Sequence, residues 1–289
     1  MEPNIVFSHV TKTYKGGVTA LEDVSFSVGS GVFGLLGHNG AGKSTLMKAL
    51  VTVEPPTSGA IQVCGFDTAR QGREVRQRLG YLPQELPMYP SLSVRDFLRY
   101  MGELKGVRDK TQVEQVLLQV EMQDFARRKI GQLSGGMRGI AQALLGEPPI
   151  LAVDEPTAGL DPEERVRFRG VLSRYARQGR TVLLSTHIVE DVHQLCQHLA
   201  VLRKGRLFYA GPSQELLHQV EGRVKVLPLG DDKELAALQR QAVVLSTTYE
   251  ERGISARLMD EEGRFPQVPP VPATLEDAYV YCMGGKSHA

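Results

Sequence analysis

The chain has 289 residues, of which 42% are hydrophobic and 23% are charged, and its formal net charge is +1. These are ordinary values for a globular protein, and the length allows one large domain with an accessory unit. Basic residues are scattered, so we expect no nucleic-acid partner. Three widely spaced cysteines predict reduced thiols and a cytoplasmic location. No apolar run approaches the roughly 18 residues of a membrane helix, so a function at a membrane would need another chain to span it.

The first third of the chain predicts strands of two kinds. Residues 4–10 and 18–28 alternate apolar with polar side chains, which is typical of half-buried strands and predicts an antiparallel pair. Residues 31–37 are continuously apolar, as in a buried parallel strand. Residues 59–65 predict a further strand. From about residue 92 to residue 145, apolar side chains recur at helical spacing.

The middle of the chain returns to alternating strands and helices. Residues 150–154 and 181–186 are apolar strands, and between them Asp161 and Pro162 predict the start of a helix that runs to about Arg177. Strands that alternate with helices predict a mostly parallel sheet. The long helical stretch interrupts this alternation, so we interpret residues 86–145 as an inserted helical subdomain.

The character of the sequence changes after Gly222. We therefore predict a main domain over residues 1–222 and a small α+β accessory region over residues 223–289. The predicted elements of that region are a strand near 223–229, a helix near 232–241, strands near 242–248 and 254–259, a Pro-rich linker over 263–274, and a last helix capped by Thr274.

The segment Gly37-His-Asn-Gly-Ala-Gly-Lys43-Ser44 fits the pattern G-x-x-x-x-G-K-[ST] and lies between a predicted buried strand and a predicted helix. Its glycines allow the backbone to turn with N–H groups pointing inward, where they can bind triphosphate oxygens together with the helix N-terminus. Lys43 adds a charge at the β- and γ-phosphates, and the hydroxyl of Ser44 can bind Mg²⁺. The pattern predicts a site for ATP and Mg²⁺.

Two further motifs agree with a nucleotide site. In the segment ILAVDEP, Asp154 ends a buried strand and is expected to face Mg²⁺ through water, while Glu155 can polarise the water that attacks the terminal phosphate. In the segment QLSGGMRG, a Ser-Gly-Gly sequence at a helix start forms a second anion site. This second site lies about twenty residues before the acidic pair.

With these three motifs the sequence resembles the ATP-binding subunit of ABC (ATP-binding cassette) transporters, from residue 1 to about residue 222. The resemblance implies an α/β P-loop NTPase fold with a mostly parallel core sheet, an antiparallel β subdomain and the inserted helical subdomain. It implies catalytic roles for Glu155, His187 and Gln84, and Mg²⁺ ligation by Ser44, Gln84 and Asp154. It implies nucleotide contacts from Tyr14, Gly37, His38, Asn39, Gly40, Ala41, Gly42, Lys43, Ser44, Thr45, Ser134, Gly135, Gly136 and Asp161.

The resemblance also implies partners. Two cassettes, as a homodimer or pseudo-dimer, would hold two ATP molecules, each between the phosphate loop of one subunit and the Ser134–Gly136 signature of the other. Closure of this dimer would drive a separate transmembrane permease at the cytoplasmic face of the membrane. Details such as Met137 and the segment LPMYPSLSVRDFLRYM resemble the single-cassette subunits of bacterial exporters. The apolar residues beside Gln84 are expected to receive a short helix of the permease.

One departure from the family pattern follows the signature. Cassettes of this branch commonly have Gln-Arg and one more residue after the position of Arg138, whereas this chain continues at once with Gly139 and Ile140. Three residues are missing from one helix. We therefore expect the signature to be slightly misplaced and hydrolysis to be slow.

Three other functions stay open at this point. The departure is compatible with a regulatory cassette that does not hydrolyse ATP. A soluble ATP-gated clamp would carry a long coiled coil, and a translation-type protein would carry two sets of motifs. The sequence has neither feature, which favours the transporter subunit.

Overall fold

A computed structural model describes residues 4–84, 89–109, 111–132, 135–157, 160–251 and 253–284. The chain divides into two compact units, which are described separately below. The main part of the second compact unit begins near residues 210–211. The domain boundary that the sequence predicts at residues 222–223 stays a prediction. The first unit comprises Met1–Ile188 and Leu195–Ala210, and the second comprises Val189–Gln194 and Gly211–Ala289.

The first unit begins with an antiparallel sheet, as its alternating sequence predicts. β1 (Ile5–Thr13) pairs with β2 (Thr19–Val28) on one side and with β4 (Ser58–Val63) on the other, and β5 (Phe66–Asp67) follows β4 in the sheet. Side chains at alternate positions are buried in parts of these strands, as at Ile5 and Phe7 of β1 and Val24, Phe26 and Val28 of β2, and the alternation is interrupted where the register shifts.

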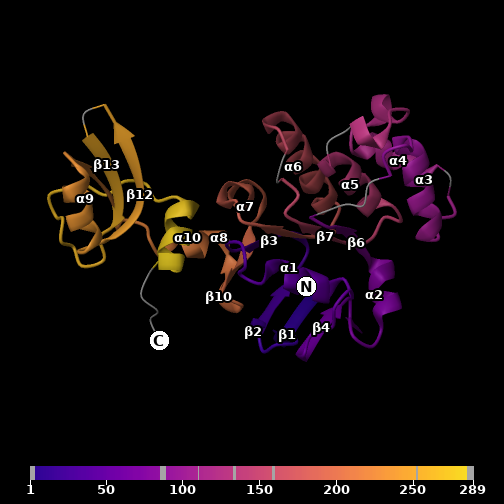
Figure 1. Ribbon diagram of the computed structural model, residues 1–289, viewed down its shortest axis with the longest axis horizontal. Coiled ribbons are helices and arrows are strands. Elements are labelled where there is room, and N and C mark those ends of the chain that lie inside the picture. Colours follow the sequence, from indigo (N-terminus) through magenta and orange to yellow (C-terminus); the bar gives the residue numbers. More distant parts are fainter. Residues whose placement is uncertain are drawn as a thin grey trace. The chain divides into compact units, whose positions relative to one another are not determined.

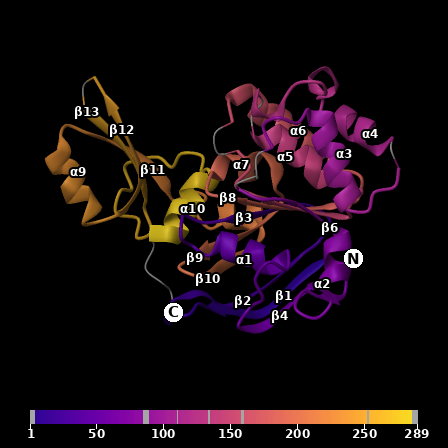
Figure 2. The ribbon, with the colours of Figure 1, turned by 45° about the vertical axis from the view of Figure 1, so that its right-hand side comes forward.

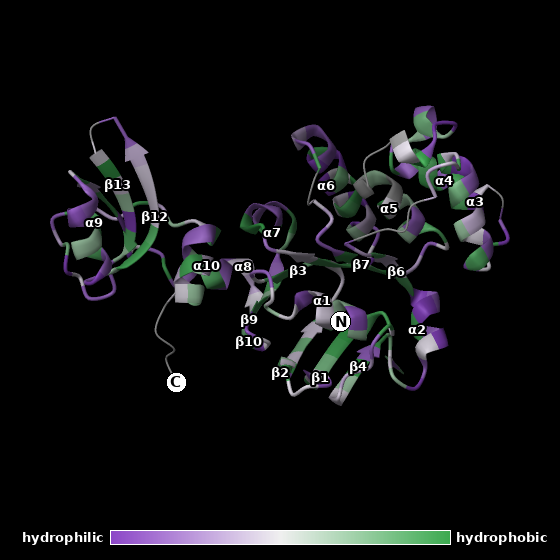
Figure 3. Cartoon of the chain, in the orientation of Figure 1, coloured by the Kyte–Doolittle hydropathy of each residue, from purple (hydrophilic) through white to green (hydrophobic). Residues whose placement is uncertain are grey.

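The second sheet of this unit is the core sheet, and its strand order is β10-β9-β3-β8-β7-β6. The pairs β3–β8 and β7–β8 are parallel, as predicted for the apolar strands. The pairs β3–β9 and β6–β7 are also parallel, although β6 and β9 were not predicted. β7 and β8 are buried along their whole length, which is why their sequences do not alternate, and Figure 3 shows the hydrophobic colouring of β7. The strands are β3 (Gly31–Leu36), β6 (Leu79–Leu82), β7 (Ile150–Asp154), β8 (Thr181–Thr186), β9 (His198–Arg203) and β10 (Arg206–Pro212).

Helix α1 (Lys43–Leu50) lies between the two sheets (Figures 1 and 2). Its buried residues Leu46, Met47 and Leu50 belong to the same hydrophobic core as Phe7 of β1 and Ile61 of β4. Helix α2 (Gly72–Arg78) leads into β6. The start of α1 is therefore fixed from both sides by packed apolar side chains.

The predicted helical subdomain is present in the described residues. It comprises α3 (Val94–Leu104), α4 (Gln112–Gln119), two short 3₁₀ helices (Gln123–Phe125 and Ile130–Gln132) and α5 (Gly135–Leu144). Helix α6 (Pro162–Ala176) begins as predicted, with Asp161 as the N-cap and proline in its first position. In Figures 1 and 2, α5 and α6 cover the face of the core sheet opposite α1.

The second unit contains a three-stranded antiparallel sheet of order β11-β13-β12. One face packs against helix α9 through Leu235 and Leu238. Helix α10 is attached to β13 by an ion pair of 2.7 Å between Arg257 and Asp277, and Thr274 Oγ accepts a hydrogen bond from the Asp277 amide, as the cap prediction requires. The elements are α7 (Val189–Leu195), α8 (Ser213–His218), β11 (Val224–Leu229), α9 (Asp232–Gln239), β12 (Val243–Glu250), β13 (Gly253–Met259) and α10 (Leu275–Gly284).

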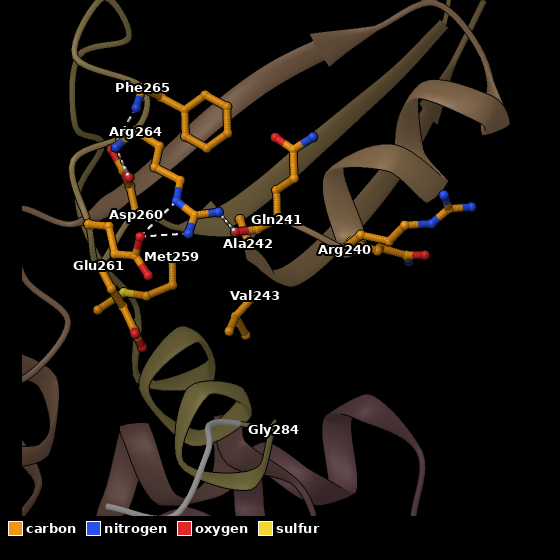
Figure 4. A pocket seen from close by; sticks show the side chains of 12 residues that line it. Arg240, Gln241, Ala242, Val243, Met259, Asp260, Glu261, Arg264, Phe265 and Gly284 are labelled. Carbon is orange, nitrogen blue, oxygen red and sulfur yellow. Dashed lines mark hydrogen bonds and ion pairs between the residues drawn. The ribbon is translucent and has the colours of Figure 1, made fainter.

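The Pro-rich stretch has no regular secondary structure, but it packs against the sheet. Asp260 accepts hydrogen bonds from the backbone amides of Arg264 and Phe265 (Figure 4). It also pairs with the buried Lys225 at 2.7 Å. The guanidinium of Arg264 donates to the carbonyl of Gln241. These bonds hold the stretch in place beside a cavity of about 340 Å³.

Candidate functional site

The carboxyl ends of four core strands meet at one edge of the sheet. In the parallel register, Leu36 of β3 lies beside Thr186 of β8, and Asp154 of β7 lies beside Ser185 of β8. Leu82 at the end of β6 lies beside Val153. The segments that follow these strands carry Gly37, Gln84, Glu155 and His187, so the sheet brings four distant parts of the sequence to one place.

The phosphate loop fits tightly between its neighbours, and this explains two of its glycines. A Cβ atom on Gly42 would lie 2.7 Å from the carbonyl oxygen of Ala20, and its φ of 104° is unfavourable for other residues. A Cβ atom on Gly37 would lie 2.6 Å from the carbonyl oxygen of Leu202. Helix α1 then begins with no side-chain cap and no acidic residue in its first turn. Its first N–H groups are therefore available to an anion.

Lys43 is buried beneath the loop, where its ammonium group contacts three oxygen atoms. It donates to the carbonyl of Gly37 at 2.7 Å and to that of His38 at 3.2 Å, and it lies 3.1 Å from Oε1 of Glu155. The second oxygen of Glu155 is 3.3 Å from Nδ1 of His187. Since the side chains of Lys43 and Glu155 are only 4% and 7% exposed, this is a buried ion pair.

These groups border a cavity of about 380 Å³. Most of its lining residues were predicted from the phosphate-loop pattern or the resemblance, but Ala20 was not. Ala20 lies on β2, and its carbonyl oxygen lies close to Gly42 of the phosphate loop. No chemical signal in the sequence marks Ala20, because its backbone and not its side chain makes this approach. The lining residues are Ala20, Asn39, Gly40, Gly42, Lys43, Ser44, Thr45, Gln84 and Glu155.

Asp154 is the most buried carboxylate of this edge, with 3% of the residue exposed. Burial raises the pKa of its carboxyl group, and its Oδ1 atom makes no hydrogen bond. The hydroxyl groups of Ser185 and Ser44 lie beside this carboxylate and act to lower its pKa, but burial outweighs them. A buried oxygen without a donor is costly unless a cation or a bound water satisfies it, so this carboxylate fits the requirements of a divalent metal.

Other predicted residues lie outside this cluster. Tyr14 is 37% exposed, does not line the cavity, and donates its hydroxyl to Glu54 at 2.9 Å. His38 is exposed, its ring contacts the carbonyl of Asn39, and it is not among the residues that line the cavity. The carboxylate of Asp161 caps α6.

The signature is only partly described. Ser134 lies outside the described residues, and Gly135 and Gly136 form the start of α5. The predicted misplacement of the signature therefore stays a prediction. At the other end of α5, Gly146 and Glu147 both have left-handed backbone, with φ values of 84° and 45°. The loop between α5 and β7 thus has an unusual conformation at Glu147, at the opposite end of the helix from the missing residues.

Comparisons with known proteins agree with this geometry. Residues 21–158 match the family described as ABC transporter. The chain is 34% identical to the Nod factor export ATP-binding protein I of Burkholderia orbicola, over 97% of both chains. It is 37% identical to the ABC transporter ATP-binding protein NatA of Bacillus subtilis, over 69% of this chain and 84% of that protein.

Solved structures of ABC ATPases have the same fold. A structure described as the ATP-binding subunit of an ABC transporter superposes with a TM-score of 0.67 at 28% identity, covering 74% of this chain and 92% of the other. A dimeric bacterial ABC transporter cassette has a TM-score of 0.65 at 25% identity, covering 72% and 98%. The full-length likeness to an export ATP-binding protein does not favour the soluble or translation-type alternatives. From its motifs, its fold and these relatives, the chain belongs to the family of ATP-binding subunits of ABC transporters.

Proposed function

We propose that this chain binds ATP with Mg²⁺ and hydrolyses it to ADP and phosphate. The observation that carries the proposal is the buried contact between Lys43 and Glu155 beside the phosphate loop. Lys43 is held where the β- and γ-phosphates would bind, so the nucleotide would replace Glu155 as its anionic partner. Glu155, released from the lysine, would orient the water that attacks the γ-phosphate. His187, already in contact with Glu155, would then contact the γ-phosphate.

The residues Asp154, Ser44 and Gln84 would hold Mg²⁺. The support for this part of the proposal is the buried Asp154 oxygen without a hydrogen bond and the presence of Ser44 and Gln84 in the lining of the same cavity. When bound, the metal would supply positive charge to the phosphate oxygens and lower the cost of charge that develops on them. The Asp154 carboxylate must be ionised for this role, although its burial favours the protonated form.

Two cassettes would act together. The known dimeric cassettes of this fold include one in a post-hydrolysis state bound to ADP and phosphate. In our proposal, the Ser134–Gly136 signature of one chain faces the phosphate loop of a second copy or a similar subunit, with Asp161 near the interface and Tyr14 at the adenine. ATP would close this dimer and hydrolysis would reopen it.

We further propose that the dimer drives a separate membrane permease from the cytoplasmic side. Among the described residues, no helix is long and apolar enough to cross a membrane. The full-length relatives that export Nod factor support the export direction. The docking site for the permease would be a groove of about 750 Å³ in the first unit, which we call the subdomain groove.

The subdomain groove lies between α2, the strand β6, the α3–α4 connection and the end of α5. It contains Val53 and Leu104, whose side chains are large, apolar, and 63% and 65% exposed. An apolar surface of this kind is stabilised by a partner that removes it from water. The apolar patch expected beside Gln84 includes Leu86, Pro87 and Met88, which lie outside the described residues.

The variant Glu155→Gln tests the proposed chemistry. The amide keeps the shape of the side chain and removes the charge that orients water, so ATP should still bind while phosphate release falls by at least about 100-fold. In size-exclusion chromatography with ATP and Mg²⁺, the variant should elute as a dimer. Phosphate release at the parental rate together with a monomer in ATP would exclude Glu155 as the base.

A further inference from the structure

The carboxyl-terminal end of α5 is held by a lysine that belongs to the subdomain groove. Lys105 follows α3, and its Nζ donates to the carbonyl oxygens of Gln142 at 3.0 Å, Leu145 at 3.3 Å and Ala143 at 3.4 Å. These are the carbonyl groups that a helix leaves unpaired at its end, and a cation there also interacts favourably with the helix dipole. Lys105 thus ties the α3–α4 connection to the helix that begins with the signature glycines.

The ammonium group of Lys105 lies among three carbonyl oxygens, although the residue as a whole is exposed. Enclosure lowers the pKa of Lys105 to about 8, by burial alone. A lysine in this position gains from any anion that reaches it, since a charged partner gives a stronger hydrogen bond than a carbonyl. Lys105, Gln142 and Leu145 all line the subdomain groove, so an occupant of the groove would reach both the lysine and the end of α5.

The charges around the groove indicate which occupant fits. Its lining has four cationic side chains, on Arg73, Arg76, Lys105 and Arg108, and one carboxylate, on Asp109. Asp109 accepts hydrogen bonds from the amide and the hydroxyl of Thr111 at 2.8 and 2.7 Å, and its single negative charge is outnumbered by the four cationic groups. In the part of the chain that the structure describes, none of the four cations forms an ion pair. The groove is therefore complementary to an acidic, amphipathic segment.

We propose that the permease segment which enters the subdomain groove carries a carboxylate, and that this carboxylate forms an ion pair with Lys105 in place of the carbonyl groups at the end of α5. This inference rests on the proposed function, in which the groove docks the permease. Docking then exchanges the carbonyls of Gln142, Ala143 and Leu145 for an anionic partner and frees the carboxyl end of α5. Because α5 is one helix with the signature glycines at its other end, the exchange links occupancy of the groove to the position of the signature.

Binding of defined peptides to the full chain tests the charge of the occupant. Three amphipathic helical peptides would share one leucine stripe and carry Glu, Gln or Lys at the polar positions. We expect the Glu peptide to bind about tenfold more tightly than the Gln peptide, as one added charge-assisted hydrogen bond would give, and the Lys peptide to bind least. Equal binding of the Glu and Gln peptides would overturn the inference and leave the groove as a docking site. If none of the three peptides binds, the inference is overturned and the docking site is removed from the proposed function. ATP binding, measured separately on the same sample, tests the nucleotide site independently of docking.

A pH series identifies the cation. Among the groups that line the groove, guanidinium groups are not deprotonated in proteins, the pKa of Asp109 is lowered by its bonds to Thr111, and burial with the charge of Asp154 raises the pKa of Tyr81 to about 12. Between about pH 7 and pH 9.5 only Lys105 among them changes charge.

Affinity for the Glu peptide should therefore fall as pH rises above about 8 in the parental chain, by up to about tenfold in total, and level off near the affinity of the Gln peptide. It should stay level in Lys105→Arg and be weak and level in Lys105→Gln, while Lys233→Gln, an exposed position in α9, should behave like the parent. A pH profile of Lys105→Arg identical to that of the parent would show that another group is responsible.

Hydrogen–deuterium exchange tests the link to α5. In the parental chain, the Glu peptide should increase amide exchange in the last turn of α5, since Lys105 no longer supports it. In Lys105→Gln this turn should exchange fast with or without the peptide. Unchanged exchange in the parental chain at saturating peptide would refute the transfer of Lys105, even if the groove prefers the acidic peptide.

Discussion

The ion pair between Lys43 and Glu155 predicts an unusual stability pattern in the nucleotide-free protein. In Lys43→Met, the buried carboxylate of Glu155 would keep His187 as its one ion-pair partner among the residues that the structure describes. Removing one partner of a buried ion pair typically costs about 3–5 kcal/mol, because the remaining charge stays out of water. Glu155→Gln should cost less, since Lys43 retains its bonds to the carbonyls of Gly37 and His38.

The double variant Lys43→Met/Glu155→Gln separates this explanation from simple loss of packing. No unpaired charge remains in it, so most of the stability lost in Lys43→Met should return. Urea unfolding of all four proteins without nucleotide would give the free energies, with the transition of the first unit followed by hydrogen exchange in β7. The reasoning is refuted if Lys43→Met costs less than about 1 kcal/mol, or if the two single losses simply add in the double variant.

Three further predictions follow from the site and from the second unit. Lys43→Ala should abolish tight ATP binding because it removes a charge from the phosphates, and a nucleotide titration with unchanged affinity would contradict the assignment. Insertion of Gln-Arg-Val after Arg138 should restore the usual length of the signature helix and raise phosphate release with the permease present, whereas equal rates would mean that the loop after α5 compensates. In the second unit, burial alone would raise the pKa of Asp277, but hydrogen bonds from Arg257 and Thr274 outweigh it and hold the pKa below its usual value. The resulting stabilisation is present above the unfolded pKa of about 3.9 and is lost as pH falls through the folded value, so acid should destabilise this unit and Asp277→Asn should flatten that loss in a pH series of unfolding curves.

Sequence reasoning predicted much of the fold, because the elements that it found carry strong local signals. The alternation in β1 and β2, the apolar runs of β3, β7 and β8, and the Asp161–Pro162 start of α6 all depend on residues close in the chain. Weaker elements were not predicted. Strand β6 has only four residues, Leu79–Leu82, and its third position is a half-buried tyrosine, so no period of apolar residues marks it. Its place beside β7 is nevertheless what brings Gln84 to the cavity.

The sequence by itself determined the chemical groups of the candidate site, since a phosphate loop and an acidic strand end are local patterns with a fixed spacing. Which of these groups contact one another was decided by the tertiary structure. The contact between Lys43 and Glu155 joins residues more than one hundred positions apart, and it exists because β3, β7 and β8 are parallel and end in register. Likewise, no pattern in the sequence distinguishes Lys105 from an ordinary surface lysine. Only the packing of the α3–α4 connection against the end of α5 encloses its ammonium group among carbonyl oxygens, and burial there gives it properties that no local pattern encodes.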